Sequence, residues 1–222
     1  MKRDGVSDGT AATKEPFLGN GDRVFIYGGG GHGRVVADTA RRAGFRVEGF
    51  IDKDPSRGVN REIFLEKARA ERFAVALGVG NNEARQAIAK FLRKEGAEIV
   101  ALIDPSAIVG SSARIGAGAV VLPNAVVNDR AQIEEGAIVN SGAIVEHECV
   151  VGEYAHIAPN ATLAGGAKVG ALANVGIGAS LIQNAIVGRS ATIGAGAVVL
   201  GEIAPFAVAV GVPSREIDKK PT

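Results

Sequence analysis

The sequence predicts an α/β N-terminal domain of the half-Rossmann type, with a parallel sheet, followed by a left-handed parallel β-helix of about five coils. Two observations support this fold class: strand and helix patterns alternate up to about residue 103, and a strict six-residue repeat follows. Glycine supplies 31 of the 222 residues, and aromatic residues make up only 5%. This composition favours a core of thin, repeated aliphatic layers over one built around large rings.

In the first part, short apolar runs that end at glycine or aspartate alternate with amphipathic stretches. The apolar runs predict strands over 24–27, 46–51, 73–77 and 99–103. The amphipathic stretches predict one helix ending at Gly44, one over about 62–72 and one over 83–94. Because strands and helices alternate, the strands should form a parallel sheet with the helices as crossovers.

The second part carries an aliphatic residue at every sixth position, from Val109 to Val199, without a slip. Four residues after each of the first fifteen of these positions comes alanine, or in one case Cys149. In a parallel β-helix, three hexapeptides form a triangular coil, the aliphatic residue points inward and the small residue fits the corner. Glycine or asparagine often follows the aliphatic residue directly, at or near the expected turns, where permissive dihedral angles help. The unbroken period also predicts that no loop is inserted between coils.

These patterns divide the chain into a flexible N-terminus over 1–22, an α/β domain over 23–103, a β-helix over 104–203 and a C-terminal cap over 204–222. Lys and Arg number 25 and Asp and Glu 24, and this balance argues against nucleic-acid partners and polybasic membrane anchors. We find no secretory signal and no apolar run long enough to span a membrane. Together with a single cysteine, these features predict a cytoplasmic protein.

A glycine-rich loop lies between the first predicted strand and helix. Gly28, Gly30 and Gly33 satisfy the pattern G-x-G-x-x-G, and Asp52 ends the second predicted strand, where it could accept a hydrogen bond from a ribose hydroxyl. The backbone N–H groups of such a loop bind phosphate or pyrophosphate. About 80 residues make only half of a dinucleotide domain, so a nucleotide sugar fits this domain better than NAD. A tight turn without a ligand is the structural alternative.

The chain has three histidines, and one of them lies in a setting that suits catalysis. His147 lies two positions after an inward aliphatic residue, so it should occupy an outer turn, and it stands between Glu146 and Glu148. Either carboxylate could orient the imidazole and make its other nitrogen a better general base. His156 falls half a coil out of phase, on another face, and a structural role is as plausible for it as a functional one.

No metal site is predicted. The β-helix carries only two histidines, and neither a C-x-x-C nor an H-E-x-x-H pattern occurs. Cys149 stands in the alanine register, so we expect a buried small side chain and not a nucleophile.

Three motifs and the chain ending carry a family resemblance: residues 27–33, 80–83 and 146–159, and the ending 211–215. On these motifs, the chain from Val24 to Ile217 resembles the bacterial hexapeptide-repeat nucleotide-sugar N-acetyltransferases. Those similar to it acetylate UDP-4-amino-4,6-dideoxy-N-acetylglucosamine in bacillosamine synthesis, or GDP-perosamine. The hexapeptide repeat alone implies acyl transfer, and the glycine loop joined to it implies a nucleotide-linked sugar as acceptor.

The resemblance also implies roles for residues. His147 would be the general base, and Glu148, which the resemblance selects over Glu146, would raise its basicity. The acetyl-CoA cosubstrate would contact His156, Gly165, Ile177 and Ala195. The nucleotide sugar would be held by Gly30, Gly31, His32, Asp52, Lys53 and Gly80. Some relatives have two aspartates where this chain has Asp52 and Lys53, which leaves the preferred nucleotide base open.

The implied enzyme is a homotrimer with active sites between neighbouring β-helices. The amine would attack the acetyl-CoA thioester directly, with a backbone N–H stabilising the oxyanion and no acyl-enzyme intermediate. A UDP-linked 4-amino-4,6-dideoxy sugar is the favoured acceptor. The alternatives are a GDP-perosamine N-acetyltransferase, a sialic-acid-type sugar O-acetyltransferase, an NAD-dependent oxidoreductase, and a non-catalytic or carbonic-anhydrase-like β-helix protein.

Overall fold

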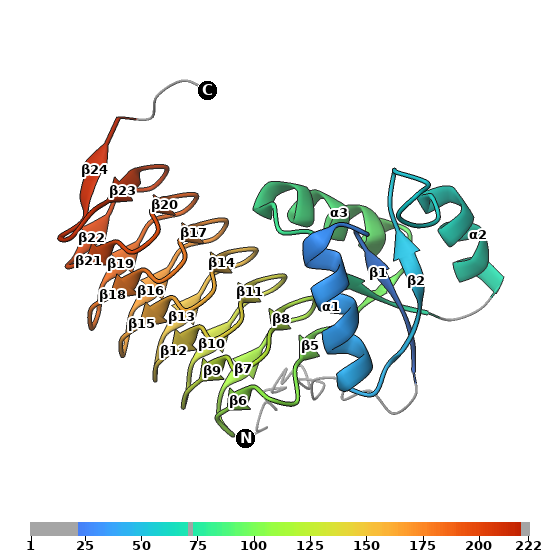
Figure 1. Cartoon of the computed structure of the whole chain (residues 1–222), viewed down its shortest axis with the longest axis horizontal. Coiled ribbons are helices and arrows are strands. Elements are labelled where there is room, and N and C mark those ends of the chain that lie inside the picture. Colours follow the sequence, from blue (N-terminus) through green and yellow to red (C-terminus); the bar gives the residue numbers. More distant parts are fainter. Residues whose placement is uncertain (1–21, 71–72, 219–222) are drawn as a thin grey trace, which may run out of the picture.

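The computed structural model describes residues 22–70 and 73–218. The predicted flexible N-terminus therefore lies, except for Asp22, outside the described residues. The α/β domain packs beside the first coils of a β-helix, and the last strand lies at the far end of that β-helix (Figure 1). Within the described ranges, no helix combines the length and apolar character needed to cross a lipid bilayer.

The α/β domain has a four-stranded parallel sheet in the order β2-β1-β3-β4, as predicted. Its elements are β1 (Arg23–Tyr27), α1 (Gly31–Arg42), β2 (Arg46–Ile51), α2 (Arg61–Ala70), β3 (Ala74–Leu77), α3 (Asn82–Lys94) and β4 (Glu98–Ile99). Gly44 follows α1 with a φ of 87°, so it ends this helix in the left-handed conformation that glycine favours.

The fourth strand departs from its prediction. One strand over 99–103 is wrong, because β4 ends at Ile99 and a separate strand, β5 (Leu102–Ile103), begins the β-helix. The N–H of Val100 still donates to Val75 of the α/β sheet at 3.0 Å, whereas the N–H of Leu102 donates to Ala119 of the next coil at 2.9 Å. The apolar run therefore serves two sheets, with the crossover between residues 100 and 102.

The β-helix has three flat sheets, which we call faces A, B and C in chain order. The edges AB, BC and CA are named after the faces they join. Face A contains β5, β8 (Val120–Val121), β11 (Ile138–Val139), β14 (His156–Ile157), β17 (Asn174–Val175), β20 (Thr192–Ile193), β23 (Val208–Val210) and the antiparallel β24 (Arg215–Ile217). Face B contains β6 (Ile108–Val109), β9 (Val126–Val127), β12 (Ile144–Val145), β15 (Thr162–Leu163), β18 (Ser180–Leu181) and β21 (Val198–Val199). Face C contains β7 (Arg114–Ile115), β10 (Gln132–Ile133), β13 (Val150–Val151), β16 (Lys168–Val169), β19 (Ile186–Val187) and β22 (Glu202–Ile203).

The hexapeptide register is confirmed, and the β-helix is somewhat longer than predicted. The aliphatic and small positions form one continuous buried core that includes Cys149. With β5 before the repeat and β22 and β23 after it, the β-helix has about six turns instead of five. The last turn is shortened, because Val187 pairs with Ile203 and the earlier aliphatic residues pair 18 positions apart.

The turns lie next to the glycine and asparagine positions, near where they were expected. The left-handed residue lies three positions after the aliphatic one, as at Asn124 and Asn160, and not directly after it. Glycine directly after the aliphatic residue serves another purpose. A Cβ at Gly170 would lie 2.6 Å from the backbone nitrogen of Arg189 in the next coil, so close packing of the coils excludes a side chain there.

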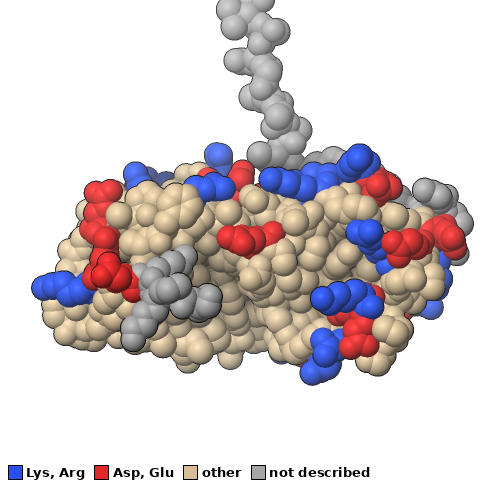
Figure 2. Space-filling view, turned by 90° about the horizontal axis from the view of Figure 1, so that it is seen from above, with Lys and Arg blue, Asp and Glu red and all other residues tan. Residues whose placement is uncertain are grey.

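The α/β domain sits on face A. Apolar residues of α1 and β1 pack against Leu102, Val120 and Leu122 of the first coils. Asp104 is 1% exposed and accepts a hydrogen bond from Arg42 of α1 at 2.5 Å, which ties the two parts together. On the side of the molecule shown in Figure 2, acidic and basic side chains are interspersed and separated by uncharged surface.

Candidate functional site

A crevice opens at the carboxyl ends of β1 and β3. The chain runs from β1 to β2 on one side of β1 and then to β3 on the other, which makes β1 a topological switch point. Ligands of open parallel sheets bind outside the strand ends at such a point. The glycine loop follows β1, and the turn 78–80 follows β3, so both border the crevice. A Cβ at Gly33 would lie 1.8 Å from the Gly28 carbonyl oxygen, so the loop admits only glycine there.

The amino end of α1 is open to the crevice. Gly30 is the N-cap, no side chain caps the helix, and its first turn has no acidic residue. A Cβ on Gly30 or Gly31 would meet no atom within 4 Å. The free N–H groups of the first helical turn and this open space suit an anionic group such as a diphosphate.

Asp52 supports the glycine loop from the end of β2. Its carboxylate accepts hydrogen bonds from the backbone N–H groups of Asp54 at 3.0 Å and Gly29 at 2.8 Å, which hold the pKa of Asp52 below its usual range. A pocket of about 340 Å³ lies beside it, lined by Tyr27, Asp52, Lys53, Asn60, Arg61 and Glu62. Asp52 and Lys53 thus border a hollow next to the loop, separate from Gly30 and Gly31.

Two histidines from distant parts of the chain meet at the other side of the crevice. The rings of His32 in α1 and His156 in β14 have centroids 6.4 Å apart. Asn140 accepts a hydrogen bond from Ser141 N–H at 2.8 Å through its oxygen, so its amide nitrogen donates to His156 Nε2 at 2.9 Å. This assignment leaves the ring hydrogen of neutral His156 on Nδ1.

Both histidines of this pair should stay neutral well below neutral pH. Burial, and next the charge of Arg85, lower the pKa of His32 and of His156 to about 4. Unfolding restores a pKa near 6.5, so the unfolded chain takes up more protons between the two values. The free energy of unfolding should therefore fall as the pH drops from about 6.5 towards 4. A ¹⁵N NMR titration should show both rings neutral at about pH 5.5. A midpoint near 6.5 for either ring would contradict the buried geometry.

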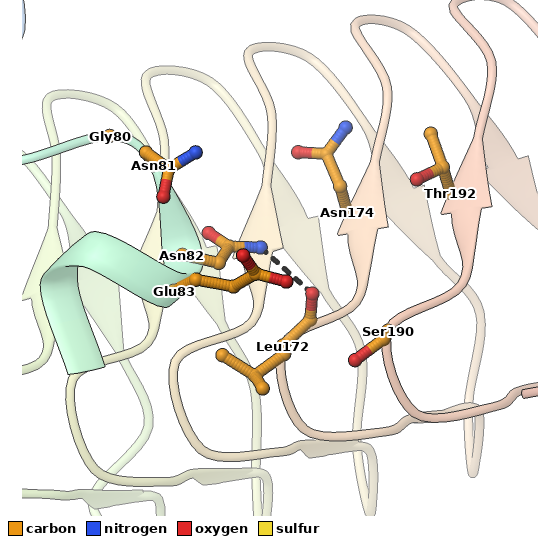
Figure 3. Close-up of a pocket in the computed structure, with 8 residues that line it drawn as sticks. All are labelled: Gly80, Asn81, Asn82, Glu83, Leu172, Asn174, Ser190 and Thr192. Carbon is orange, nitrogen blue, oxygen red and sulfur yellow. Dashed lines mark hydrogen bonds between the residues drawn. The ribbon is translucent and has the colours of Figure 1, made fainter. Parts of the chain in front are cut away.

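A second pocket continues from the crevice along face A (Figure 3). Its volume is about 350 Å³, and it is lined by Gly80, Asn81, Asn82, Glu83, Leu172, Asn174, Ser190 and Thr192. The amino end of α3 forms one wall, where Asn81 caps the helix by accepting from Ala84 N–H at 2.8 Å. The Asn82 amide reaches across and donates to the Leu172 carbonyl at 3.0 Å. The sequence motif 80–83 thus lies between the α/β domain and the β-helix.

The third histidine lies on edge BC. His147 Nδ1 is 3.2 Å from Glu148 Oε2, and the other oxygen of Glu148 is 3.3 Å from Arg130 Nη1. The side chains of His147 and Glu148 are each 51% exposed. Glu146 instead accepts the backbone N–H of His147 at 3.3 Å and makes no contact with the ring nitrogen. The arrangement leaves Nε2 of His147 free for a substrate.

Gly165 lies directly under this imidazole, one coil further along edge BC. A Cβ on Gly165 would lie 2.5 Å from both Cε1 and Nε2 of His147. Ile177 and Ala195 lie on edge AB, in adjacent coils joined by a hydrogen bond from Gly196 N–H to the Ile177 carbonyl at 2.8 Å. Ile177 is 60% exposed, like several other large aliphatic side chains of the β-helix surface.

The structure thus divides the predicted site residues into separate groups. Gly30, Gly31, His32 and Gly80 meet His156 on face A, whereas His147, Glu148 and Gly165 gather on edge BC. In a triangular prism, edge BC is opposite face A. Within one chain, His147 therefore lies on the far side of the β-helix from the glycine loop.

Sequence reasoning missed Asn140 and Arg85. Arg85 is fully buried together with Ala89 and Leu92 on the inner side of α3. An arginine in helical register with apolar residues is the signal that could have found it. Asn140 offered no such signal, because asparagine recurs at hexapeptide turns.

The side chains of His, Cys, Asp and Glu are the candidates for metal binding, and that of Cys149 also for nucleophilic attack. Among residues 22–70 and 73–218, no three His, Cys, Asp or Glu side chains gather as metal ligands would. Cys149 is buried, its thiol lies 3.2 Å from the Ala164 carbonyl, and burial raises the pKa of this thiol. Its position in the core agrees with the expected packing role.

A glycine-loop α/β domain joined to a hexapeptide β-helix is the architecture of a hexapeptide-repeat transferase with an added N-terminal domain. Comparison with protein families agrees: residues 23–92 match the PglD N-terminal domain, and residues 130–165 match the bacterial transferase hexapeptide repeat. UDP-N-acetylbacillosamine N-acetyltransferase of Bacillus subtilis is 34% identical over 109 residues, 45% of this chain. The matched segment spans 50% of the length of that relative.

Solved structures match over nearly the whole chain. PerB of Caulobacter crescentus, in complex with CoA and GDP-perosamine, is 34% identical with a TM-score of 0.85, covering 91% of this chain and 100% of PerB. The acetyltransferase domain of PglB of Neisseria gonorrhoeae, in complex with acetyl coenzyme A, is 33% identical with a TM-score of 0.83, covering 89% and 100%. This chain belongs to the family of hexapeptide-repeat sugar N-acetyltransferases with a PglD-type N-terminal domain.

Proposed function

We propose that this protein transfers the acetyl group of acetyl-CoA to the 4-amino group of a nucleotide-linked 4-amino-4,6-dideoxy sugar. One observation carries the proposal: the same chain holds an uncapped helix end at a glycine-lined crevice and a carboxylate-paired histidine on its β-helix. The helix end suits a diphosphate, and the histidine suits deprotonation of an amine. The PerB complex with CoA and GDP-perosamine supports this pairing of ligands.

His147 acts as the general base in this proposal. Glu148 holds the ring at Nδ1, so that Nε2 takes a proton from the sugar amine. The amine nitrogen bonds to the thioester carbon, a backbone N–H stabilises the oxyanion, and the C–S bond then breaks. The departing CoA thiolate takes a proton.

The active site lies between two subunits of a homotrimer. The glycine loop and His147 are on opposite sides of one β-helix, too far apart within a chain to act on the same sugar. A threefold arrangement that sets edge BC of one subunit against face A of the next brings them together. Acetyl-CoA then lies in the groove between neighbouring β-helices, beside Gly165, Ile177, Ala195 and His156.

A UDP-linked sugar is the favoured acceptor, and its nucleotide occupies the crevice. The residues that hold it are Gly30, Gly31, His32, Asp52, Lys53 and Gly80. A GDP-linked acceptor is the second candidate, because PerB, which was solved with GDP-perosamine, matches 91% of this chain.

The release of CoA thiol from acetyl-CoA tests the proposal with four acceptors. The panel contains UDP-4-amino-4,6-dideoxy-N-acetylglucosamine, GDP-perosamine, dTDP-4-amino-4,6-dideoxyglucose and a sialic acid. Fast turnover with the UDP-linked sugar is the expected result. Turnover with only GDP-perosamine would show that the acceptor carries GDP instead of UDP. Turnover with only the sialic acid would show that the enzyme acetylates a hydroxyl group and not an amine. No turnover with any of them would refute the acceptor class.

Gly30→Asp tests the diphosphate site. Aspartate is a favoured N-cap residue, and a Cβ fits in the open space at Gly30, so the fold should remain stable. The new carboxylate occupies the helix end and repels a diphosphate, so we expect the KM for the nucleotide sugar to rise about tenfold or more. Gly30→Asn is the matched control, since it has the same shape without the charge and should have a clearly smaller effect. Equal KM values for the two variants would show that no anion binds there.

A further inference from the structure

Arg85 in α3 is a buried cation that the proposed reaction does not use. Its exposed fraction is 0%, and burial lowers its pKa to about 10, so it stays charged at neutral pH. Among the described residues no carboxylate pairs with it; its partners are carbonyl and amide oxygens only. A buried charge without a counter-ion is costly and needs its hydrogen bonds to be complete.

The guanidinium has five N–H groups, and the structure offers acceptors for all of them. Nε donates to the Gly136 carbonyl at 2.7 Å, and Nη1 donates to the carbonyls of Val79 and Gly80, both at 3.0 Å. Nη2 donates to the Asn82 side-chain oxygen at 2.9 Å and to the carbonyls of Tyr154 at 2.7 Å and Ala155 at 3.3 Å. One planar side chain thus joins the turn after β3, the start of α3 and two successive coils of the β-helix.

These partners adjoin the candidate site on both sides. Gly80 borders the crevice, and a Cβ on it would lie 4.0 Å from the His32 ring. Ala155 directly precedes His156, whose ring faces His32. Because Arg85 bonds the carbonyls of Gly80 and Ala155 at once, a change in its geometry would move the two walls of the crevice relative to each other.

We propose that Arg85 is a positioning residue that sets the spacing between the glycine-loop crevice and His156, and thereby the fit of the nucleotide-linked sugar. The role of the crevice rests on the proposed function above. Lysine cannot replace arginine here, since its three N–H donors leave at least two of these buried acceptors unpaired and its point charge cannot span both walls.

Arg93 provides a matched control on the same helix. It also joins α3 to edge CA, through an ion pair with Glu135, but its side chain is 42% exposed and touches neither Gly80 nor the coil of His156. If Arg85 were only a strut between the two parts, Arg85→Lys and Arg93→Lys would differ only in stability.

The test compares these two variants by ¹⁵N-histidine NMR and by steady-state kinetics. The chain has three histidines, so each signal is assigned with one substitution. Arg85→Lys should shift the His32 and His156 signals, leave His147 on the opposite edge unchanged, and raise the KM for the nucleotide sugar about tenfold. Arg93→Lys should change neither the signals nor the KM.

Unchanged His32 and His156 signals in a folded Arg85→Lys protein would overturn the proposal. So would equal shifts of all three histidines, which would indicate a general loss of structure. The NMR result needs no substrate, so it tests whether Arg85 sets the spacing of the two walls even if the acceptor panel shows no turnover. If the signals shift but the KM of an active acceptor does not, the spacing role stands refuted for that sugar.

Discussion

Replacing His147 with alanine should lower kcat by about 10²–10⁴-fold while the proposed trimer stays intact. His147 is the only histidine on edge BC, and the proposed reaction uses its Nε2 as the base. Its side chain is half-exposed and lies outside the buried core, so its removal leaves no cavity. The measurement is CoA release at saturating substrates, with analytical ultracentrifugation to confirm assembly.

The two neighbouring glutamates give a matched comparison for this prediction. Glu148→Gln removes the carboxylate beside Nδ1 and should reduce kcat by about tenfold or more, with a shift in the pH dependence of kcat. Glu146→Gln changes a residue that contacts only the backbone N–H of His147, and kcat should remain near normal. Near-normal turnover of His147→Ala would refute the role of His147 as the base. A larger loss of kcat for Glu146→Gln than for Glu148→Gln would show that Glu146, and not Glu148, supports the imidazole.

Replacing Gly165 with alanine should reduce kcat by about 10²-fold without a comparable loss of stability. The new Cβ would lie 2.5 Å from Cε1 and Nε2 of His147, whereas ordinary contact begins at 3.4 Å. The imidazole must therefore move by about 1 Å, and its hydrogen bond with Glu148 cannot then keep its present geometry. Thermal unfolding and kcat should be measured on the same preparation.

Gly201 supplies the control for this variant. It lies on the same edge, in the shortened last turn, and a Cβ on it would meet no atom within 4 Å. Gly201→Ala should therefore leave both kcat and thermal stability unchanged. If Gly165→Ala also retains full kcat, then the position of the His147 ring does not determine turnover.

The sequence alone could predict most of the fold, because hydrophobic period carries that information. The six-residue repeat defined the core register from Val109 to Val199, and its alanine positions are the buried corners. Glycine after the aliphatic residue marked the neighbourhood of each turn, but it reflects the close approach of the next coil, and the left-handed residue comes two positions later. The prediction of one strand over 99–103 was wrong, because an apolar run does not show that its two ends belong to different sheets.

The candidate site was predictable in parts and not as an assembly. Position within the hexapeptide placed His147 on an outer turn, and the glycine pattern placed the loop at the start of α1. The approach of His32 to His156 depends on how the α/β domain sits on face A, which no local pattern encodes. The same holds for Arg85, whose partners come from three segments far apart in sequence.

Mixed trimers test the central claim, that one active site takes its glycine loop and its His147 from different subunits. Chains carrying His147→Ala should be nearly inactive, and chains carrying Gly30→Asp should keep about a tenth of the activity or less when the nucleotide sugar is well below the KM, so the assay uses that concentration. The two chains are co-expressed with different tags. In trimers purified by both tags, about one site in three should combine an intact loop with an intact His147 of the neighbour, and activity should return in that proportion. If the purified mixed trimers remain as inactive as the parent variants, the loop and His147 act within one chain and the proposed site is wrong.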